Sequence, residues 1–352
     1  MVELVDTLGL EPSAARRGGS TPSIPTNQHK MRKKSFLFNF FLCLHIPLIS
    51  LDNEVVFSKY QNLKSYEIKQ KSFCKKRSPL NRIIWLEDFI TPSLSESDWS
   101  YEISNGFIHR GRYIAGWGNE ELQYYQEGEG ANFTNDNLFI ENGFLKIQPI
   151  FHKYGFKEFN YTSARINTKN KLSFNPSTRL TLCFKAPKGT GAWPAFWLMP
   201  SNSFDWPQGG EIDILEHRGR ISNVVSSALH FGKSPSEKST LVGEVSIPEY
   251  VNFQEYFHSI TFEWKDNLLS FYLDDAAEPY WQIDSESKFF KEFSFPFDSS
   301  FYLIINVAVG GIYDQSRVDS KAFCMDKFCS NKSDPDHARF IVDWIEYSNI
   351  ED

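Results

Sequence analysis

The sequence predicts an all-β fold, a β-sandwich of antiparallel sheets. Aromatic residues, which are enriched in strands, make up 16% of the 352-residue chain. The turn-forming residues Gly, Pro, Asn, Asp and Ser recur between short apolar runs. Apolar residues at the 3.6-residue spacing of a helix are missing after residue 82, except for one short helical turn expected at 248–253. Many short strands separated by turns are typical of a sandwich.

Individual strands are expected where a short apolar run lies between two turn signals. The predicted strands include residues 139–148, 259–264, 268–273 and 301–309.

The N-terminal region has a different composition. Residues 31–34 are Met-Arg-Lys-Lys and precede an apolar stretch that ends at residue 50, an order typical of a secretory signal peptide. We therefore expect an over-extended gene start at 1–30, a signal peptide at 31–50, a basic spacer at 51–81 and one folded domain at 82–352. The expected location is extracellular or periplasmic, with no stable membrane association after cleavage. The alternative is an uncleaved membrane anchor, for which the apolar stretch is short.

Five cysteines are spread along the chain. Cys43 lies in the expected signal peptide, which leaves Cys74 and Cys183 together with Cys324 and Cys329. The last two lie close together in a loop-like segment, where an oxidising exterior would favour a local disulfide. Zinc binding by these thiols is disfavoured because the sequence has no second pair of ligands at a suitable spacing.

The charge balance excludes several function classes. The net charge is −7 at pH 7, so the chain lacks the basic surface expected of a nucleic-acid-binding protein. The sequence contains neither a phosphate-binding loop nor a dinucleotide-binding motif. We expect no nucleic-acid partner and no organic cofactor.

The segment Gly-Glu-Ile-Asp-Ile-Leu-Glu, which ends at Glu216, carries three carboxylates. Side chains alternate along a strand, so Glu211 and Asp213 share a face and Glu216 would point the other way. One extra residue absorbed as a β-bulge at Ile214 and Leu215 would return Glu216 to the same face. Such a pattern alone is more often a solvated strand edge. Two carboxyl groups about 5 to 5.5 Å apart, one with a raised pKa, are what retaining glycosidases use.

Two tryptophans, Trp193 and Trp197, precede the acidic segment and share one face of a predicted strand. The same alternation places Phe196 and Leu198 on the opposite side, toward the core. Sugars present apolar CH faces that stack on indole rings, so the tryptophans predict binding subsites in a groove. The alternative is that they fill the core.

The three acids resemble the signature of glycoside hydrolase family 16, in the longer form seen in laminarinases. Other segments resemble the family in the same order along the chain: residues 116–125, 162–166, 228–232, 306–311 and 342–345. The resemblance covers roughly the last three quarters of the chain. It implies that residues 82–352 form a family 16 catalytic domain.

The resemblance implies a jelly roll in which two curved antiparallel sheets pack face to face and the concave sheet forms an open cleft. The implied protein is a secreted, monomeric, endo-acting β-1,3-glucanase that retains anomeric configuration and needs no cofactor for catalysis. Its polysaccharide substrate would be laminarin-like, or a β-1,3-1,4-glucan. Glu211 would be the nucleophile, Glu216 the acid and base, and Asp213 a hydrogen-bonding partner of Glu211.

The resemblance also assigns binding residues. The substrate-binding side chains that it implies are Asn119, Arg165, Trp193, Trp197, Trp206 and His230. Without it, His230 would more often be a structural histidine. Many relatives hold a calcium ion on the convex side, and Asp343 is the matching position.

Two other functions remain open. One is a β-glucan-recognition protein, a class whose members have this fold without the catalytic acids. The three acids present here argue against that function. The other is a transglycosylase, which would pass the glycosyl group to a second sugar. Agar, carrageenan and porphyran are further candidate polymers. Sulfated polymers usually require basic groups in the groove, where Arg165 is the main one recognisable, so neutral glucan is favoured.

Overall fold

The structure, a computed structural model, describes residues 72–128, 136–202, 204–326, 329 and 333–350, and the backbone of Glu3–Leu4. The predicted signal peptide at 31–50 lies outside the described residues, as do most of the predicted gene start and spacer. Within the described part, no helix is long and apolar enough to cross a membrane.

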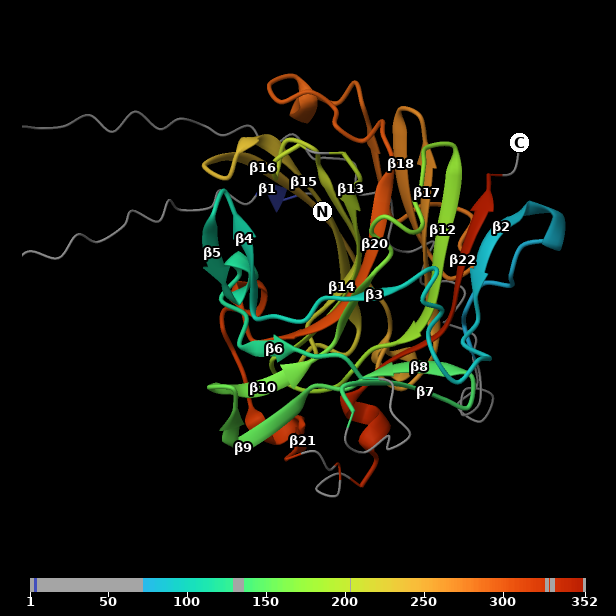
Figure 1. Cartoon of the computed structure of the whole chain (residues 1–352). Coiled ribbons are helices and arrows are strands. Elements are labelled where there is room, and N and C mark those ends of the chain that lie inside the picture. Colours follow the sequence, from blue (N-terminus) through green and yellow to red (C-terminus); the bar gives the residue numbers. More distant parts are fainter. Residues whose placement is uncertain are drawn as a thin grey trace, which may run out of the picture.

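Two eight-stranded sheets, antiparallel throughout, form the sandwich (Figure 1). The first has the order β1-β16-β15-β14-β13-β20-β11-β3. Its strands are β1 (Glu3–Leu4), β3 (Ser100–Tyr101), β11 (Arg165–Asn167), β13 (Ala192–Pro200), β14 (Glu211–His217), β15 (Val224–Ser234), β16 (Glu237–Ser246) and β20 (Phe301–Val309). The second has the order β19-β18-β17-β12-β22-β8-β7, with β2 also paired to β22. Its strands are β2 (Ile83–Glu87), β7 (Leu138–Glu141), β8 (Phe144–Ile147), β12 (Thr178–Lys185), β17 (His258–Lys265), β18 (Leu268–Leu273), β19 (Trp281–Asp284) and β22 (Phe340–Asn349).

Smaller elements flank the sandwich. A four-stranded sheet contains β6 (Gln123–Tyr125), β9 (Ile150–Phe156), β10 (Phe159–Ser163) and β21 (Cys324–Met325), and a hairpin contains β4 (Gly106–His109) and β5 (Arg112–Ala115). The helices of the described part are all short 3₁₀ turns: η1 (Leu80–Arg82), η2 (Gly116–Gly118), η3 (Glu249–Val251), η4 (Lys288–Phe290), η5 (Ile312–Asp314), η6 (Ser320–Ala322) and η7 (Pro335–Ala338). The predicted all-β fold and the jelly-roll sandwich are confirmed.

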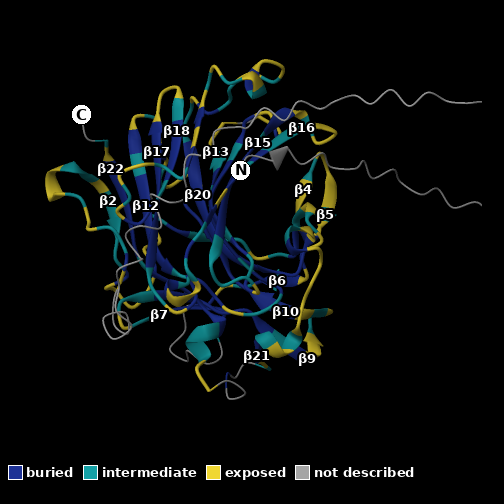
Figure 2. Cartoon of the chain, turned by 180° about the vertical axis from the view of Figure 1, so that it is seen from behind, coloured by how far each residue is buried: buried dark blue, intermediate teal, exposed yellow. Residues whose placement is uncertain are grey.

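The core lies between the two large sheets (Figure 2). Both sheets contribute fully buried side chains to it: Phe196, Ile212 and Leu229 from the first, and Leu182, Phe262 and Ile345 from the second. Burying one such side chain stabilises the fold by about 1.5 to 3 kcal/mol. Because one face of β13 and β14 is committed to this core, the other face is free to carry polar chemistry.

The predicted strands at 268–273 and 301–309 coincide with β18 and β20, and the strand at 259–264 lies within β17. The helical turn expected at 248–253 contains η3. The single strand expected at 139–148 is wrong, because the chain turns back at Asn142 and Gly143 and forms the hairpin of β7 and β8. Both turn residues have a left-handed φ, 55° and 79°, and an Asn-Gly pair tolerates that conformation in a two-residue hairpin loop.

Two disulfides join the described cysteines: Cys324 to Cys329, as favoured by the sequence, and Cys74 to Cys183, which the sequence analysis did not pair. Cys183 lies on β12, so the second bond fastens the segment before η1 to the sandwich. The neighbouring Phe73 is also part of the core. The folded part therefore includes residues before the predicted boundary at residue 82.

Candidate active site

A β-bulge in β14 brings the three carboxylates to one face. Asp213 pairs with Ala228 of β15, and Glu216 pairs with Ser226, so the two residues between the acids face a single residue of β15. These two residues, Ile214 and Leu215, are both completely buried in the core. The bulge predicted from the sequence spacing is confirmed, and Glu216 does not point into the core.

Each carboxylate is held by a different ring. Trp206, in the connection between β13 and β14, donates its indole N–H to Glu211 Oε2 at 2.6 Å. Trp193 Nε1 of β13 donates to Glu216 Oε1 at 3.0 Å. The His230 ring lies across the strand pair from Glu211 and places Nε2 3.0 Å from Asp213 Oδ2.

Burial raises the pKa of both glutamates, and each accepts a hydrogen bond from a different tryptophan. The pKa of Glu211 is raised to about 7 by burial and by the Asp213 carboxylate, while His230 and the Trp206 N–H stabilise its charged form. The pKa of Glu216 is raised to about 8 by burial and by the Asp213 carboxylate, while His230 and the Trp193 N–H stabilise its charged form. Both pKa values lie near neutral pH, where one glutamate of such a pair can be ionised as a nucleophile while the other is protonated as an acid.

Asp213 is the least exposed of the three acids, with 7% of its side chain accessible. Burial raises its pKa to about 8, and the Lys238 ammonium of β16 opposes the rise. That ammonium lies 4.8 Å from the centre of the Trp206 ring. Lys238 was not predicted, because its proximity follows from the pairing of β16 with β15 and from the path of the loop that carries Trp206.

The tryptophans of β13 lie on the face of the carboxylates, as alternation predicted, and both have additional partners. The Trp193 ring stacks on Tyr313 with a centroid distance of 4.8 Å and an interplanar angle of 18°. Trp197 donates its indole N–H to Asn306 Oδ1 of β20 at 2.8 Å, and the Arg165 guanidinium lies 4.8 Å above its ring. Each ring is half-buried, so part of each remains accessible to a ligand.

A buried network joins the segment 119–125 to Trp197. Asn119 Nδ2 donates to Glu121 Oε1 at 3.3 Å, and the Tyr125 hydroxyl donates to Glu121 Oε2 at 3.2 Å. Asn306 Nδ2 then donates to that hydroxyl at 3.0 Å. Asn119 therefore connects to the face of the carboxylates through other side chains. Glu121, Tyr125 and Asn306 were not predicted as site residues, although all three lie in segments that carried the resemblance.

Arg165 is buried in the same region. Its guanidinium lies 4.0 Å from the centre of the Trp117 ring, and its Nε lies 2.5 Å from Glu102 Oε2. Its charge is therefore already neutralised by a carboxylate, and its flat face contacts two tryptophans. This arrangement suits a positioning role better than capture of an anionic substituent.

The hairpin of β4 and β5 reaches the loop that carries Trp206. Arg110 at its tip donates two hydrogen bonds to Asp205 Oδ2, at 3.2 Å and 2.5 Å. On the same hairpin, Phe107 stacks on Trp117 with a centroid distance of 6.0 Å. The hairpin thus forms a wall that faces the carboxylate-bearing strands (Figure 1).

Asp343 lies on β22 of the other sheet, away from the carboxylates, with Cys183 Sγ 3.7 Å from its Oδ2. Burial raises the pKa of Asp343 and the Arg77 guanidinium lowers it. Arg77 also lies 3.6 Å from Asp88. Calcium requires six to eight oxygen ligands, and a guanidinium beside the carboxylate repels a cation. The described side chains at this position do not fit a calcium ion.

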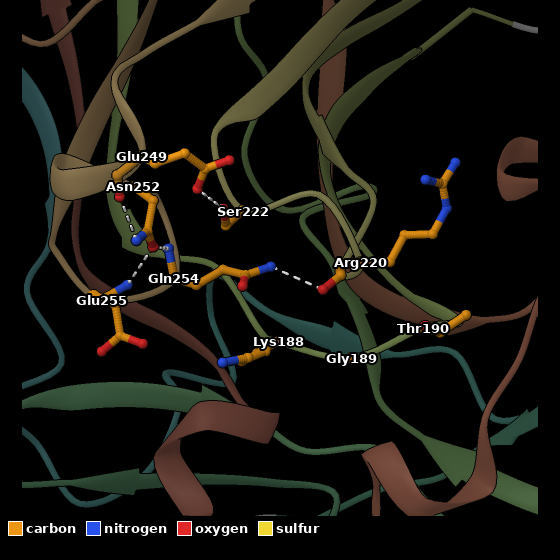
Figure 3. A pocket seen from close by; sticks show the side chains of 10 residues that line it. Lys188, Gly189, Thr190, Arg220, Ser222, Glu249, Asn252, Gln254 and Glu255 are labelled. Atoms are coloured by element: carbon orange, nitrogen blue, oxygen red, sulfur yellow. Dashed lines mark hydrogen bonds between the residues drawn. The ribbon is translucent and has the colours of Figure 1, made fainter.

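A cavity of about 470 Å³ lies elsewhere, among the loops after β12 and β14 and the segment around η3 (Figure 3). Its lining residues are all polar or glycine: Lys188, Gly189, Thr190, Gly219, Arg220, Ser222, Glu249, Asn252, Gln254 and Glu255. Part of this polar surface is already satisfied, since Arg220 pairs with Asp314 at 2.8 Å. With no aromatic ring in its wall, the cavity lacks the platform that a sugar requires, and the carboxylate face remains the candidate site.

Comparison with known proteins identifies the family to which the chain is similar. The family model described as glycosyl hydrolases family 16 matches residues 111–323, which include the carboxylates and both β13 tryptophans. The chain is 35% identical over 240 residues to a glucan endo-1,3-beta-glucosidase of Cryptopygus antarcticus, covering 64% of this chain and 80% of that protein. The endo-beta-1,3-glucanase structure from Pyrococcus furiosus matches with a TM-score of 0.64 at 30% identity, covering 77% of this chain and 95% of the other.

One further relative is much longer than this chain. Glucan endo-1,3-beta-glucosidase A1 of Niallia circulans is 31% identical over 246 residues, which are 67% of this chain and 35% of the relative. The similarity to that protein therefore concerns one part of it.

Proposed function

This chain belongs to glycosyl hydrolases family 16, and on that premise we propose that it is an endo-acting β-1,3-glucanase that retains anomeric configuration. The observation that carries the proposal is the bulged strand β14, which presents Glu211 and Glu216 on one face in different hydrogen-bonding environments. A protein that only binds glucan has no need for two glutamates with raised pKa values on one face.

The reaction follows from these environments. Glu211, stabilised as an anion by the Trp206 N–H, attacks the anomeric carbon and forms a glycosyl-enzyme. Glu216, which the raised pKa keeps protonated, gives its proton to the leaving glycosidic oxygen. The Glu216 carboxylate then takes a proton from the water that releases the sugar. Two inversions at the same carbon give net retention.

Asp213 and His230 have a supporting part in this sequence. When Asp213 ionises, its charge raises the pKa of Glu216, which favours the protonated acid that the first step requires. His230 stabilises the charged form of Glu211. Because both effects are electrostatic, they depend on the exclusion of water from this buried cluster.

Variants of the two glutamates test the mechanism. Glu211→Gln should lose activity on laminarin by several orders of magnitude while its circular dichroism spectrum is unchanged. Glu216→Ala should be rescued in part by azide on a substrate with a good leaving group and give a β-glycosyl azide. An α-azide, or near wild-type turnover of Glu211→Gln, would contradict the assigned roles.

A substrate panel tests the polymer and the mode of attack. Release of reducing ends from laminarin, lichenan, agarose and carrageenan should be fastest with laminarin, whose early products should be mixed oligosaccharides. Glucose as the sole early product would indicate exo action. The neutral substrate is supported by the pairing of Arg165 with Glu102, which leaves this buried cation little capacity to bind a sulfate.

We further propose that the protein is exported. The support is the order of charged and apolar residues at 31–50 and the presence of two disulfides, which persist in oxidising compartments. Mass spectrometry of the secreted protein after expression from Met31 should show a mature N-terminus beyond the apolar stretch. Because the side chains around Asp343 do not fit a calcium ion, thermal unfolding should be the same with and without a chelator.

A further inference from the structure

Three potential metal ligands converge from two neighbouring strands. Glu211 and Asp213 of β14 and His230 of β15 each bring one ligand atom within 4.8 Å of the other two, and no other group of three such side chains occurs in the described part of the chain. His230 Nε2 lies 3.0 Å from Asp213 Oδ2 and 3.9 Å from Glu211 Oε1. The set is two carboxylate oxygens and one imidazole nitrogen.

These distances suit a small tetrahedral ion. Zinc bonds to nitrogen and carboxylate oxygen are about 2.0 to 2.2 Å long, which places tetrahedral ligands about 3.3 Å apart. The two distances from His230, 3.0 and 3.9 Å, lie on either side of that value. Rotation of these side chains would bring the three ligand atoms to the spacing of a three-ligand site.

The neighbours of the three ligands also suit a metal. Thr240 Oγ1 lies 2.9 Å from His230 Nδ1, and a hydroxyl can either donate or accept. When Nε2 gives its lone pair to a metal, Thr240 can accept the N–H of Nδ1, the arrangement that orients most metal-bound histidines. The second oxygen of Glu211 is already fixed by Trp206.

We propose that this set is a reversible inhibitory site for a divalent transition-metal ion, with Zn²⁺ as the representative. A mixed nitrogen and oxygen set favours such ions over Ca²⁺ and Mg²⁺, which prefer oxygen ligands alone. The bound ion occupies Oε1 of the Glu211 carboxylate, so it competes with substrate. Glu216 is not a ligand.

Titration of the full-length Glu216→Gln protein with ZnCl₂ in a calorimeter tests the site without depending on activity. One equivalent should bind, and Co²⁺ should give the visible absorption bands of a tetrahedral site. An added His230→Gln substitution should weaken binding at least tenfold, and Thr240→Val should weaken it about 10- to 100-fold. If Glu216→Gln fails to fold, the same titration of the wild-type protein measures zinc binding instead.

The matched control is His337, which lies 3.5 Å from Glu255 and 3.4 Å from Asp334 on the surface. His337→Gln should leave zinc binding unchanged. Loss of binding in this variant, undiminished binding after His230→Gln, or no binding at millimolar Zn²⁺ would each overturn the proposal. In the active enzyme, inhibition by Zn²⁺ should be competitive with glucan and reversed by a chelator. The calorimetric titration needs no turnover. A protein without glucanase activity would therefore contradict the proposed function, and the titration would still decide whether the zinc site exists.

Discussion

The indole N–H of Trp206 is predicted to set the acidic limb of the pH profile. It donates to Glu211 Oε2 at 2.6 Å, and burial together with the Asp213 charge already raises the pKa of Glu211 to about 7. Trp206→Phe retains an aromatic ring and removes the donor. The charged form of Glu211 then loses stabilisation, so its pKa rises further and a smaller fraction of the nucleophile is ionised at low pH.

The size of the shift follows from the bond. A hydrogen bond to a charged group contributes about 1.5 to 3 kcal/mol, and one pKa unit corresponds to about 1.4 kcal/mol. His230 lowers the pKa of Glu211 more strongly than the Trp206 indole does. We therefore expect Trp206→Phe to raise that pKa by an amount at the lower end of this range, about one unit. On the acidic limb, kcat/KM should therefore fall about tenfold, and the loss should vanish on the alkaline side. A loss of sugar contact alone would lower kcat/KM at every pH.

The measurement is kcat/KM on a soluble laminarin oligosaccharide between about pH 4.5 and 9.5. Trp193→Phe is the matched control, because its N–H donates to Glu216 at 3.0 Å instead. Removing that donor raises the pKa of Glu216, so the alkaline limb should move to higher pH while the acidic limb stays. The limbs report the coupled cluster as a whole. If Trp206→Phe moved only the alkaline limb, the two glutamates would have exchanged roles.

Three further outcomes are expected. Burial raises the pKa of Asp213 from 3.8 to about 8, so the folded protein binds the proton of this carboxyl group more tightly than the unfolded chain does. The resulting stabilisation is fully present below about pH 4 and is lost as the pH rises toward 8. Asp213→Asn should therefore raise Tm, measured by calorimetry, more at pH 8.5 than at pH 5. An equal change at both pH values would contradict the raised pKa of Asp213. Cys74→Ser removes a crosslink to Cys183 that spans 109 residues and should lower the free energy of unfolding in urea by about 2 to 5 kcal/mol; an unchanged midpoint would show that the bond adds nothing. Trp197→Ala should lower kcat/KM on laminarin about tenfold, which is about 1.4 kcal/mol; unchanged kinetics with a lower Tm would assign Trp197 to the core.

The order of residues along β14 was enough to predict its chemistry. Alternation assigns Glu211 and Asp213 to one face, and the odd offset of Glu216 requires a bulge, which the pairing with β15 contains. The same parity separated Trp193 and Trp197 from the core-facing Phe196 of β13. These predictions succeed because the faces of a strand are a local property of a chain with a two-residue period.

Local pattern was insufficient where the chain reverses within an apolar run. Residues 139–148 have the composition of one strand, and the Asn142-Gly143 turn divides them into β7 and β8. The turn signal was present in the sequence. The apolar residues on both sides obscured it, since both halves pack into the same core.

The tertiary structure alone decided which groups set the chemistry of the acids. Trp206 reaches Glu211 from a connecting loop, Lys238 comes from the next strand pair, and Trp193 donates to Glu216 from β13. The bond between Cys74 and Cys183 likewise joins residues far apart in the chain. Sequence spacing determines the strand and the face on which a side chain lies. The distances that shift a pKa or close a disulfide depend on how separate strands and loops are packed together, and that packing is a property of the whole core.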